Sequence, residues 1–346
     1  MRPTPLVWDD AMHIEYSSGF IIYRENKSGK LEFLFLRKKN GDIDIPKGHI
    51  EKGENALRAA IRETKEETSL DVKPDRFFNI RRYYWFRFGK ETIKKYLTVF
   101  LSEYMGGEVK VSSEHEGYEW IEPAKAVAEY SKKHYNSDYI DAAVGYLEKQ
   151  RLLQELNEAY SRLPETFRKW ELSRRFVPGE GPYNAEIMVI GQAPGANEDD
   201  SGRPFVGRAG KLLDSLLRSA GIPRKKAYIT SVVQFFPYGN RMPTEEEIEA
   251  CKPFLFKQIS IIKPKLVITL GSLASMTVSG VGAIKSNHGT VVKRDGINYF
   301  CTMHPAAAVR IKSNMPIIKG DFLKLKPLAK EALSAKKEKG NQNLAS

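Results

Sequence analysis

Short stretches rich in aromatic and β-branched residues occupy the first third of the chain and predict strands. Strands are expected over 14–23 and 31–37, on either side of the polar turn 25–30. Three more are predicted over 43–45, 76–88 and 96–104. Between the third and the fourth, apolar residues change to helical spacing from Asn55 to about Leu70, which predicts one amphipathic helix inside a β-rich region.

Apolar runs and helical segments alternate regularly in the second half. The runs predict strands over 185–190, 227–233, 266–270 and 297–303. Helices are predicted over 206–220 and 245–262, and the second opens with Thr244 and Glu247 at the spacing of a capping box. This alternation is typical of a doubly wound α/β domain with a parallel sheet, whose ligands lie at the carboxyl ends of the strands.

The two halves are joined by helical spacing instead of a flexible linker. Residues 137–163 predict a helix that closes the first domain and continues into the second, with room for a break near 149–151. We therefore expect domains over 1–148 and 149–346. The lysine-rich stretch 324–339 is expected to form a basic C-terminal tail.

Charge is distributed unevenly between these halves. The chain has 346 residues and a net charge of +12. Residues 1–150 hold 25 basic and 25 acidic side chains, whereas residues 151–346 hold 30 and 18, so the second half is expected to meet a polyanion such as DNA. A generally basic surface would give the same count.

Other aspects of composition exclude membrane and disulfide-rich classes. No apolar run approaches the 18 residues that a membrane-spanning helix needs, and the N-terminus lacks a signal-peptide pattern. The cysteines are Cys251 and Cys301, far apart in sequence, which predicts a reducing, cytoplasmic location without disulfides.

A group of acids ends the early helix. Glu63 and Glu67 lie four residues apart and share one face, with Glu66 beside them, and Arg62 can pair with Glu66. Acids in the last turn of a helix are unfavourable by roughly 0.3–1 kcal/mol each when exposed. A hard divalent cation such as Mg²⁺ reverses that cost, because it binds carboxylates and bridges them to phosphates. The alternative is a solvated acidic face.

The full spacing from Gly48 to Leu70 resembles the Nudix box, Gly-x5-Glu-x7-Arg-Glu-apolar-x-Glu-Glu-x-Gly-apolar. Thr64 replaces an apolar residue of that pattern and Ser69 replaces its last glycine. The resemblance implies an α/β/α sandwich with a mixed sheet, covering about residues 14–147. It also implies Mg²⁺ (or Mn²⁺) and attack of water on phosphorus in a nucleoside diphosphate linked to another moiety.

Two flanking motifs resemble the diadenosine-tetraphosphate hydrolase branch of that family: Pro-Lys-Gly-His at 46–49 and Glu-His-x-x-Tyr-x-Trp at 114–120. Oxidised dNTPs and RNA 5′ ends remain alternative substrates. The resemblance implies metal ligands at Glu54, Glu63, Glu66 and Glu67, catalytic roles for Glu63, Glu67 and Glu114, and substrate contacts at Lys47, Arg62 and Tyr118.

Turn motifs follow the strands of the second half, over 191–199, 202–208, 239–243 and 304–310. Their order over residues 151–328 resembles family 4 uracil-DNA glycosylases. The resemblance implies a base flipped into a pocket. It implies catalytic roles for Glu198 and His304 and substrate contacts at Gly191, Gln192, Phe205, Ser231 and Arg310.

Three departures from the glycosylase pattern change the expectation. Only Cys251 occupies a position of the family's four cluster cysteines, and Phe235 replaces another, so no iron–sulfur cluster is expected. Ser231 stands where the family has a uracil-reading asparagine, and a hydroxyl cannot match the uracil edge with a paired donor and acceptor. Gln192 replaces a glutamate of the family.

The sequence therefore predicts a fusion of two enzymes that act in nucleotide and DNA maintenance. The first half would hydrolyse a nucleoside polyphosphate and the second would remove uracil or another deaminated base from DNA. The alternative is that the glycosylase-like half only binds nucleic acid. No membrane partner is expected, and the sequence leaves the oligomeric state open.

Overall fold

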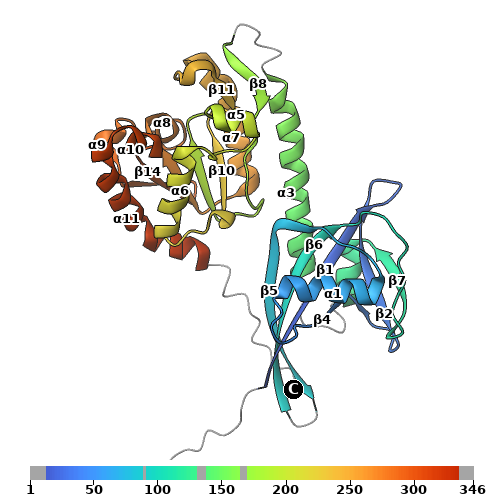
Figure 1. Cartoon of the computed structure of the whole chain (residues 1–346). Helices are drawn as coiled ribbons and strands as arrows, with labels where there is room; N and C mark the ends of the chain where they lie inside the picture. Colours follow the sequence, from blue (N-terminus) through green and yellow to red (C-terminus); the bar gives the residue numbers. More distant parts are fainter. Residues whose placement is uncertain (1–12, 89–90, 131–137, 164–169, 335–346) are drawn as a thin grey trace, which may run out of the picture. The chain divides into compact units, whose positions relative to one another are not determined.

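The computed structural model describes residues 13–88, 91–130, 138–163 and 170–334. The chain separates into two compact units, one within Met1–Gly145 and one within Tyr146–Glu338 (Figure 1). In the described part of the chain, no helix combines the length and the apolar character needed to cross a bilayer.

The first unit is built on a mixed sheet in the order β3-β2-β1-β6-β5, with β4 paired to β1 and β7 paired to β2. Its strands are β1 (His13–Glu25), β2 (Leu31–Lys38), β3 (Ile43–Asp44), β4 (Lys47–His49), β5 (Pro74–Phe88), β6 (Glu91–Glu103) and β7 (His115–Ile121). β1 and β6 are parallel, whereas the other pairs are antiparallel. The predicted mixed sheet is confirmed. The two motifs flanking the acid-rich helix proved to be strands β4 and β7.

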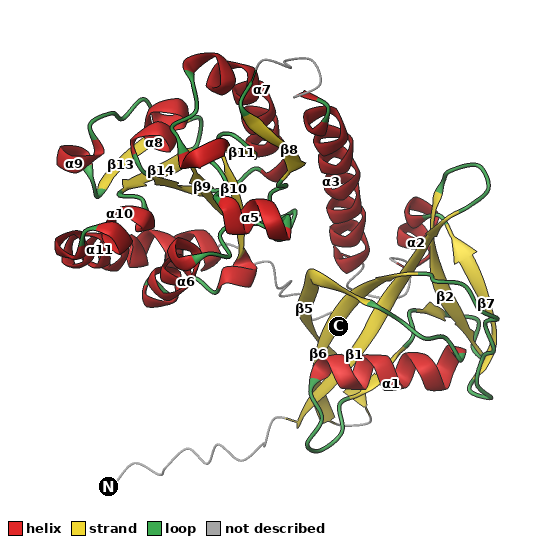
Figure 2. Ribbon diagram, turned by 45° about the horizontal axis from the view of Figure 1, so that its top comes forward, coloured by secondary structure: helices red, strands yellow, loops and turns green. Residues whose placement is uncertain are grey.

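Helix α1 (Ala56–Thr68) crosses the long strands of this sheet (Figure 2). Its Ala60 packs with Phe20, Ile22 and Leu34 from β1 and β2, and Leu70 closes the same core. Burying this apolar stripe leaves the glutamates of α1 on its other side. Helix α2 (Pro123–Tyr130) packs against β2.

The second unit contains a five-stranded sheet in the order β10-β9-β12-β14-β13. The strands are β9 (Ile187–Gly191), β10 (Ala227–Ser231), β12 (Leu266–Leu270), β13 (Thr290–Arg294) and β14 (Ile297–Thr302). Four of them are parallel and β13 is antiparallel to β14. Asp295 and Gly296 both have positive φ and form the tight turn that folds β13 back. The doubly wound fold is confirmed, with this antiparallel edge strand added.

Alternate side chains of β9 enter two different cores. Ile187 and Val189 pack with Leu213 and Phe322 on one face of the sheet. Met188 and Ile190 pack in the second core, on the other face.

The remaining helices described in the chain are α3 (Asp138–Ser161), α5 (Ala196–Ser201), α6 (Arg208–Ser219), α7 (Glu245–Ile262), α8 (Ser272–Ser279), α9 (Ile284–Asn287), α10 (Pro305–Arg310) and α11 (Met315–Ser334). Short 3₁₀ turns cover Arg224–Lys226, Tyr238–Asn240 and Lys312–Asn314. β8 (Leu172–Phe176) and β11 (Phe235–Pro237) form a separate small sheet.

Two helices differ from the expectation. α3 is continuous through 149–151, where a break was allowed. α11 includes most of the stretch expected as a basic tail, because Ile318, Phe322, Leu325 and Ala329 recur at helical spacing and are buried. The rest of that stretch lies outside the described residues.

Candidate active sites

Hydrogen-bonded caps define both ends of helix α1, which carries the glutamates of the first candidate site. The Asn55 side chain accepts hydrogen bonds from Leu57 N and Arg58 N, each 3.1 Å long. At the other end Ser69 adopts a left-handed φ of 61° and its amide donates to Lys65 O. This conformation explains the glycine at that position in the Nudix pattern, because a residue with a Cβ adopts it at a cost of roughly 1–2 kcal/mol.

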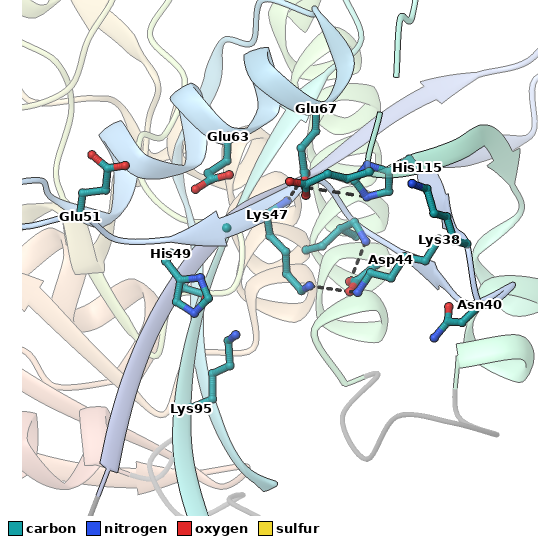
Figure 3. Close-up of a pocket in the computed structure, with 15 residues that line it drawn as sticks. Lys38, Asn40, Asp44, Lys47, His49, Glu51, Glu63, Glu67, Lys95 and His115 are labelled. Atoms are coloured by element: carbon teal, nitrogen blue, oxygen red, sulfur yellow. Dashed lines mark hydrogen bonds and ion pairs between the residues drawn. The ribbon is translucent and has the colours of Figure 1, made fainter. Parts of the chain in front are cut away.

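Gly48 leaves space for the carboxylate of Glu63, one of the predicted metal ligands. A Cβ built on Gly48 would lie 2.1 Å from both carboxylate oxygens of Glu63. The absence of a side chain at Gly48 therefore allows Glu63 to lie directly against the backbone of β4, with its carboxylate turned into a cavity (Figure 3).

Arg62 forms hydrogen bonds with three of the predicted metal ligands. Its guanidinium donates to Glu54 (3.0 Å), Glu63 (2.9 Å), Glu66 (3.1 Å) and the carbonyl of His49 (3.0 Å). These hydrogen bonds raise the pKa of Arg62, and the one to Glu54 lowers the pKa of Glu54. The predicted pairing of Arg62 with Glu66 is present.

Glu67 is an acid of this site with a raised pKa. Burial raises its pKa to about 7, against the lowering effect of Lys47, and the negative charges of Glu63 and Asp44 add to the rise. One of its oxygens accepts from Lys47 N at 2.9 Å, and the other lies 3.8 Å from His115 Nε2. Crowded carboxylates of this kind are stabilised by a bound divalent cation.

Asp44 was not identified from the sequence. It is buried at the end of β3, and its carboxylate accepts from the ammonium groups of Lys38 (2.7 Å) and Lys47 (Figure 3). Burial opposes its ionisation, but the two lysines outweigh that effect and hold its pKa well below the usual range. The available signal was an acid flanked by isoleucines in a short apolar run. Asp44 orients both ammonium groups beside the cavity.

One cavity of about 660 Å³ collects most of these groups. Lys38, Asp44, Lys47, Glu63, Glu67, Glu114 and His115 line it. Four other predicted residues are not among its lining residues: Glu54, Arg62, Glu66 and Tyr118. The predicted four-glutamate ligand set is therefore divided, because Glu63 and Glu67 line the cavity whereas Glu54 and Glu66 do not.

The side chains of this cavity offer the type of ligand that Mg²⁺ prefers, because Glu63 and Glu67 present carboxylate oxygens one helical turn apart. Within the described ranges, no group of three or more His, Cys, Asp or Glu side chains is arranged to hold a metal ion. A third protein ligand would need a side chain to move, and Glu114 is exposed at the same cavity.

The second site is a cavity of about 300 Å³ at the carboxyl ends of β9, β10 and β14. It brings together most of the residues predicted for the second half: Gln192, Glu198, Phe205, Ser231, His304 and Arg310. Gly191 lies behind it, where a Cβ would stand 2.5 Å from the Phe205 ring. The strand ends thus converge on one site, as the fold class requires.

Phe205 is held in a strained conformation. Its φ is 54°, in the left-handed region that a bulky residue rarely adopts. Arg224 donates to the carbonyls of Pro204 (2.7 Å) and Phe205 (3.2 Å), and Gly210 has no Cβ to collide with Phe205 O. The ring lies against His304, with centroids 5.7 Å apart and planes at 26°. The surrounding contacts present an aromatic face to the cavity.

Glu198 uses both carboxylate oxygens to join two loops. One oxygen accepts from Val206 N (2.9 Å) and Gly207 N (2.8 Å), and the other accepts from Gly195 N (3.1 Å). The carboxylate still lines the cavity. In this structure it therefore positions the Phe205 loop in addition to facing the site.

The hydrogen bonds of His304 determine its tautomer. Ala306 N donates to Nδ1 at 3.1 Å, so the neutral ring carries its proton on Nε2. Burial lowers the pKa of His304 to about 4, the charge of Arg310 lowers it further, and Glu198 opposes both. The ring is thus a neutral hydrogen-bond donor at pH 7.

Ser231 lines the cavity, and so do two carboxamides, Gln192 and Asn240. Asn240 was not identified from the sequence. It has a φ of 56° in a 3₁₀ turn, and its Oδ1 lies 3.5 Å from a Cβ built on Gly195. The signal was present in Gly-Asn-Arg-x-Pro. A carboxamide supplies the adjacent donor and acceptor that Ser231 lacks.

Aromatic rings surround Cys251, the one cysteine at a cluster position. Tyr160 of α3 lies 4.4 Å from Phe254 in a stacked arrangement, 5.4 Å from Phe235 and 5.3 Å from Phe176, between ring centroids. Burial raises the pKa of the Cys251 thiol to about 12, although Tyr160 opposes the rise. The thiol is therefore protonated and lies in an apolar core.

Comparison with known proteins identifies the family of the second half. The family model of the uracil DNA glycosylase superfamily matches residues 178–330. The Type-4 uracil-DNA glycosylase of Sulfurisphaera tokodaii is 41% identical over 172 residues, which cover 46% of this chain and 77% of that protein. The Thermotoga maritima Type-4 enzyme is 44% identical over 141 residues, covering 40% and 73%.

The NUDIX domain model matches residues 15–142. Among solved structures, a Caenorhabditis elegans Ap4A hydrolase complex is similar at 27% identity and a TM-score of 0.35, covering 39% of this chain and 98% of that one. The MutT protein of Methanosarcina mazei is similar at 24% identity and a TM-score of 0.32, covering 39% and 95%. The chain belongs to the uracil-DNA glycosylase superfamily through its C-terminal half and carries a NUDIX domain in its N-terminal half.

Proposed function

We propose that the N-terminal half hydrolyses a nucleoside polyphosphate of the dinucleoside tetraphosphate type with Mg²⁺. The observation that carries this proposal is the single cavity in which the carboxylates of Glu63 and Glu67 face the ammonium groups of Lys38 and Lys47. Carboxylates that can bind a cation and ammonium groups that can bind phosphate oxygens thus line the same cavity.

Each side chain of this cavity then has a defined task. Glu63 and Glu67, with Glu66 and Glu54 nearby on Arg62, would hold Mg²⁺, which when bound neutralises phosphate charge and lowers the pKa of a water molecule. Lys47 and Lys38, oriented by Asp44, bind the phosphates. Glu114 at the rim accepts the proton of the attacking water.

A substrate panel with Mg²⁺ tests this proposal. Product analysis should show rapid cleavage of diadenosine tetraphosphate and slower cleavage of oxidised dNTPs and triphosphorylated RNA. Glu63→Gln and Glu67→Gln should each reduce turnover at least 100-fold. Glu122→Gln is the matched control, because Glu122 is exposed and pairs with Lys30 away from the cavity. Full turnover in either cavity variant would disprove the assignment.

We propose further that the C-terminal half excises uracil or another deaminated base from DNA. The supporting observation is one cavity lined by an aromatic ring, a neutral histidine donor and a carboxylate: Phe205, His304 and Glu198. Phe205 would stack on the flipped base and His304 Nε2 would donate to the oxygen that gains charge as the glycosidic bond breaks. Arg310 would bind a phosphate beside the flipped nucleotide.

A specific observation favours the alternative that this half only binds DNA. Ser231 replaces the base-reading asparagine of the resemblance, and Glu198 is occupied by three backbone amides. Incubation with uracil-containing oligonucleotides followed by alkali distinguishes the two. Alkali-labile sites, raised by Ser231→Asn and lost in His304→Ala, support excision. Tight binding without such sites supports the binding role.

A further inference from the structure

The N-terminal sheet carries aromatic and basic side chains in rows across three strands. Directly paired residues share a face of the sheet. Tyr83 of β5 is paired with Tyr96 of β6, and Tyr96 with Tyr16 of β1, while Trp85 is paired with Lys94 in the next row. We call this surface the aromatic strip, defined by Tyr16, Arg81, Tyr83, Trp85, Lys94 and Tyr96.

The rings of the strip form a continuous row. The centroids of Tyr16 and Tyr96 are 5.4 Å apart with an interplanar angle of 12°, and those of Tyr96 and Tyr83 are 5.8 Å apart. Tyr16 is 44% exposed and Trp85 is 36% exposed. Exposed rings at this density are unusual on a protein surface, because each presents apolar area to water.

Two cations lie among these rings. Lys94 Nζ is 4.5 Å from the Tyr83 centroid and 5.1 Å from that of Trp85, and Arg81 Cζ is 4.6 Å from Tyr96. No ion pair joins Arg81 or Lys94 to a carboxylate in the parts of the chain that the structure covers. The positive charge of the strip is therefore available to an external anion.

The strip is separate from the catalytic cavity. Lys95, the next residue after Lys94, lines that cavity and pairs with Glu15 at 3.2 Å. Tyr84, paired with Lys95, is largely buried, which raises its pKa to about 12. Successive side chains of a strand point to opposite faces, so the strip occupies the other face of β5 and β6.

We propose that the aromatic strip binds single-stranded DNA. Unpaired bases stack on Tyr16 and Trp85, and Arg81 and Lys94 contact the phosphates between them. The choice of DNA rests on the function proposed for the C-terminal half. Duplex DNA does not fit, because its bases are already stacked and hide their faces. The polyphosphate substrate is assigned to the cavity instead, because the strip lies on the opposite face of β5 and β6 from Lys95, which lines that cavity.

The test uses the full-length protein and a 20-residue oligothymidylate, which contains no uracil. Anisotropy titration should show at least a tenfold loss of affinity in the double variant Tyr16→Ala/Trp85→Ala, the size expected when one or two stacked bases lose their partners. Phe256→Ala is the matched control, because Phe256 is an aromatic residue of similar exposure (39%) on α7, outside the strip and both cavities, and its affinity should stay within twofold. Equal affinity of the double variant and the native protein would overturn the proposal.

Two further measurements separate stacking from nonspecific attraction and from misfolding. Binding should quench tryptophan fluorescence, and Trp85→Phe should remove the quench while retaining most of the affinity. Arg81→Gln/Lys94→Gln should reduce the salt slope of log K by about 0.7 for each phosphate that the protein no longer neutralises. Unchanged circular dichroism and polyphosphate hydrolysis show that the variants fold. Equal binding of duplex DNA or of RNA contradicts the proposal, whereas a failed excision assay tests only the glycosylase function.

Discussion

At the scale of single residues, the two sites depend on backbone positions as much as on reactive groups. Gly48 admits the Glu63 carboxylate, and Phe205 is held at a left-handed φ by Arg224 and Gly210. Neither position carries out chemistry, yet each sets where a reactive or stacking group lies. Substitutions there are expected to change activity more than stability.

Gly48→Ala provides the first such prediction. The new methyl group would meet the Glu63 carboxylate, which is the flexible end of a side chain and moves away. We expect polyphosphate hydrolysis to fall by about two orders of magnitude, because a misplaced ligand loses the metal and the substrate alignment. Steady-state kinetics measure this effect. Gly117→Ala is the control, since a Cβ there meets no atom within 4 Å, and equal losses in both variants would contradict the explanation.

His304 gives a prediction about pH. Its pKa of about 4 lies below the value of about 6.5 in an unfolded chain. A lowered folded-state pKa contributes stability that is fully present above pH 6.5 and is lost as the pH falls toward 4. Between pH 7 and 4.5 the native protein should lose on the order of 2 kcal/mol more than His304→Asn. Urea unfolding at the two pH values measures the difference, and identical losses would refute the burial effect.

The sequence predicted which residues lie together where they belong to strand-end motifs, and predicted this poorly where it depends on a three-dimensional neighbour. Gln192, Phe205, Ser231 and His304 share a cavity as expected, because strand ends meet at one edge of a parallel sheet. Asp44 was missed, because its two lysine partners lie on different strands. The pairing of Arg62 with Glu66 was predicted from their spacing, whereas its hydrogen bonds to Glu54 could not be read from spacing alone.

At the scale of elements, helix α3 contributes its last turns to the C-terminal core. Tyr160 fills the space beside Cys251 with three phenylalanine rings, at a position that the glycosylase resemblance associates with a metal cluster. Its hydroxyl also donates to Val232 O and accepts from Gln234 N, each at 3.3 Å. Side-chain packing therefore stabilises the fold at that position.

Tyr160→Ala should be strongly destabilising. Removing a buried ring leaves a cavity and costs roughly 3–5 kcal/mol, whereas Tyr160→Phe removes two hydrogen bonds and costs about 1–2 kcal/mol. Thermal unfolding of both variants measures the contrast. If the two variants were equally stable, the ring cluster would not be the stabilising feature.

The sequence also predicted some elements better than others. Long amphipathic segments and strongly apolar runs gave α7, β9 and β12 correctly, since their periodicity is clear. The antiparallel strand β13 was missed although Asp295-Gly296 is a hairpin turn signal, because few apolar residues mark the strand itself. The buried apolar stripe of α11 was not predicted, because lysines are interspersed among its apolar residues.

At the scale of the whole molecule, we expect the two halves to differ in their need for divalent cations. Two carboxylates face the N-terminal cavity from one helix face, whereas Glu198 is the one carboxylate among the described residues lining the C-terminal cavity, and backbone amides already bind it. EDTA should therefore abolish polyphosphate hydrolysis and leave DNA binding and uracil release unchanged. Assays on one preparation, with Mg²⁺ restored as a control, measure both. Loss of both activities would show that they share a cation.

Helix α3 limits how the molecule can be divided. Asp138, near its start, pairs with Arg82 of the first unit, whereas Tyr146 already packs on Tyr183 of the second. A protease cut or gene truncation at Gly145 would leave each of these pairs within its own fragment, but it would break the intrahelical hydrogen bonds that run through this point of α3. Either half, if expressed alone, should therefore be longer than its family boundaries suggest, and both fragments should include residues 138–161.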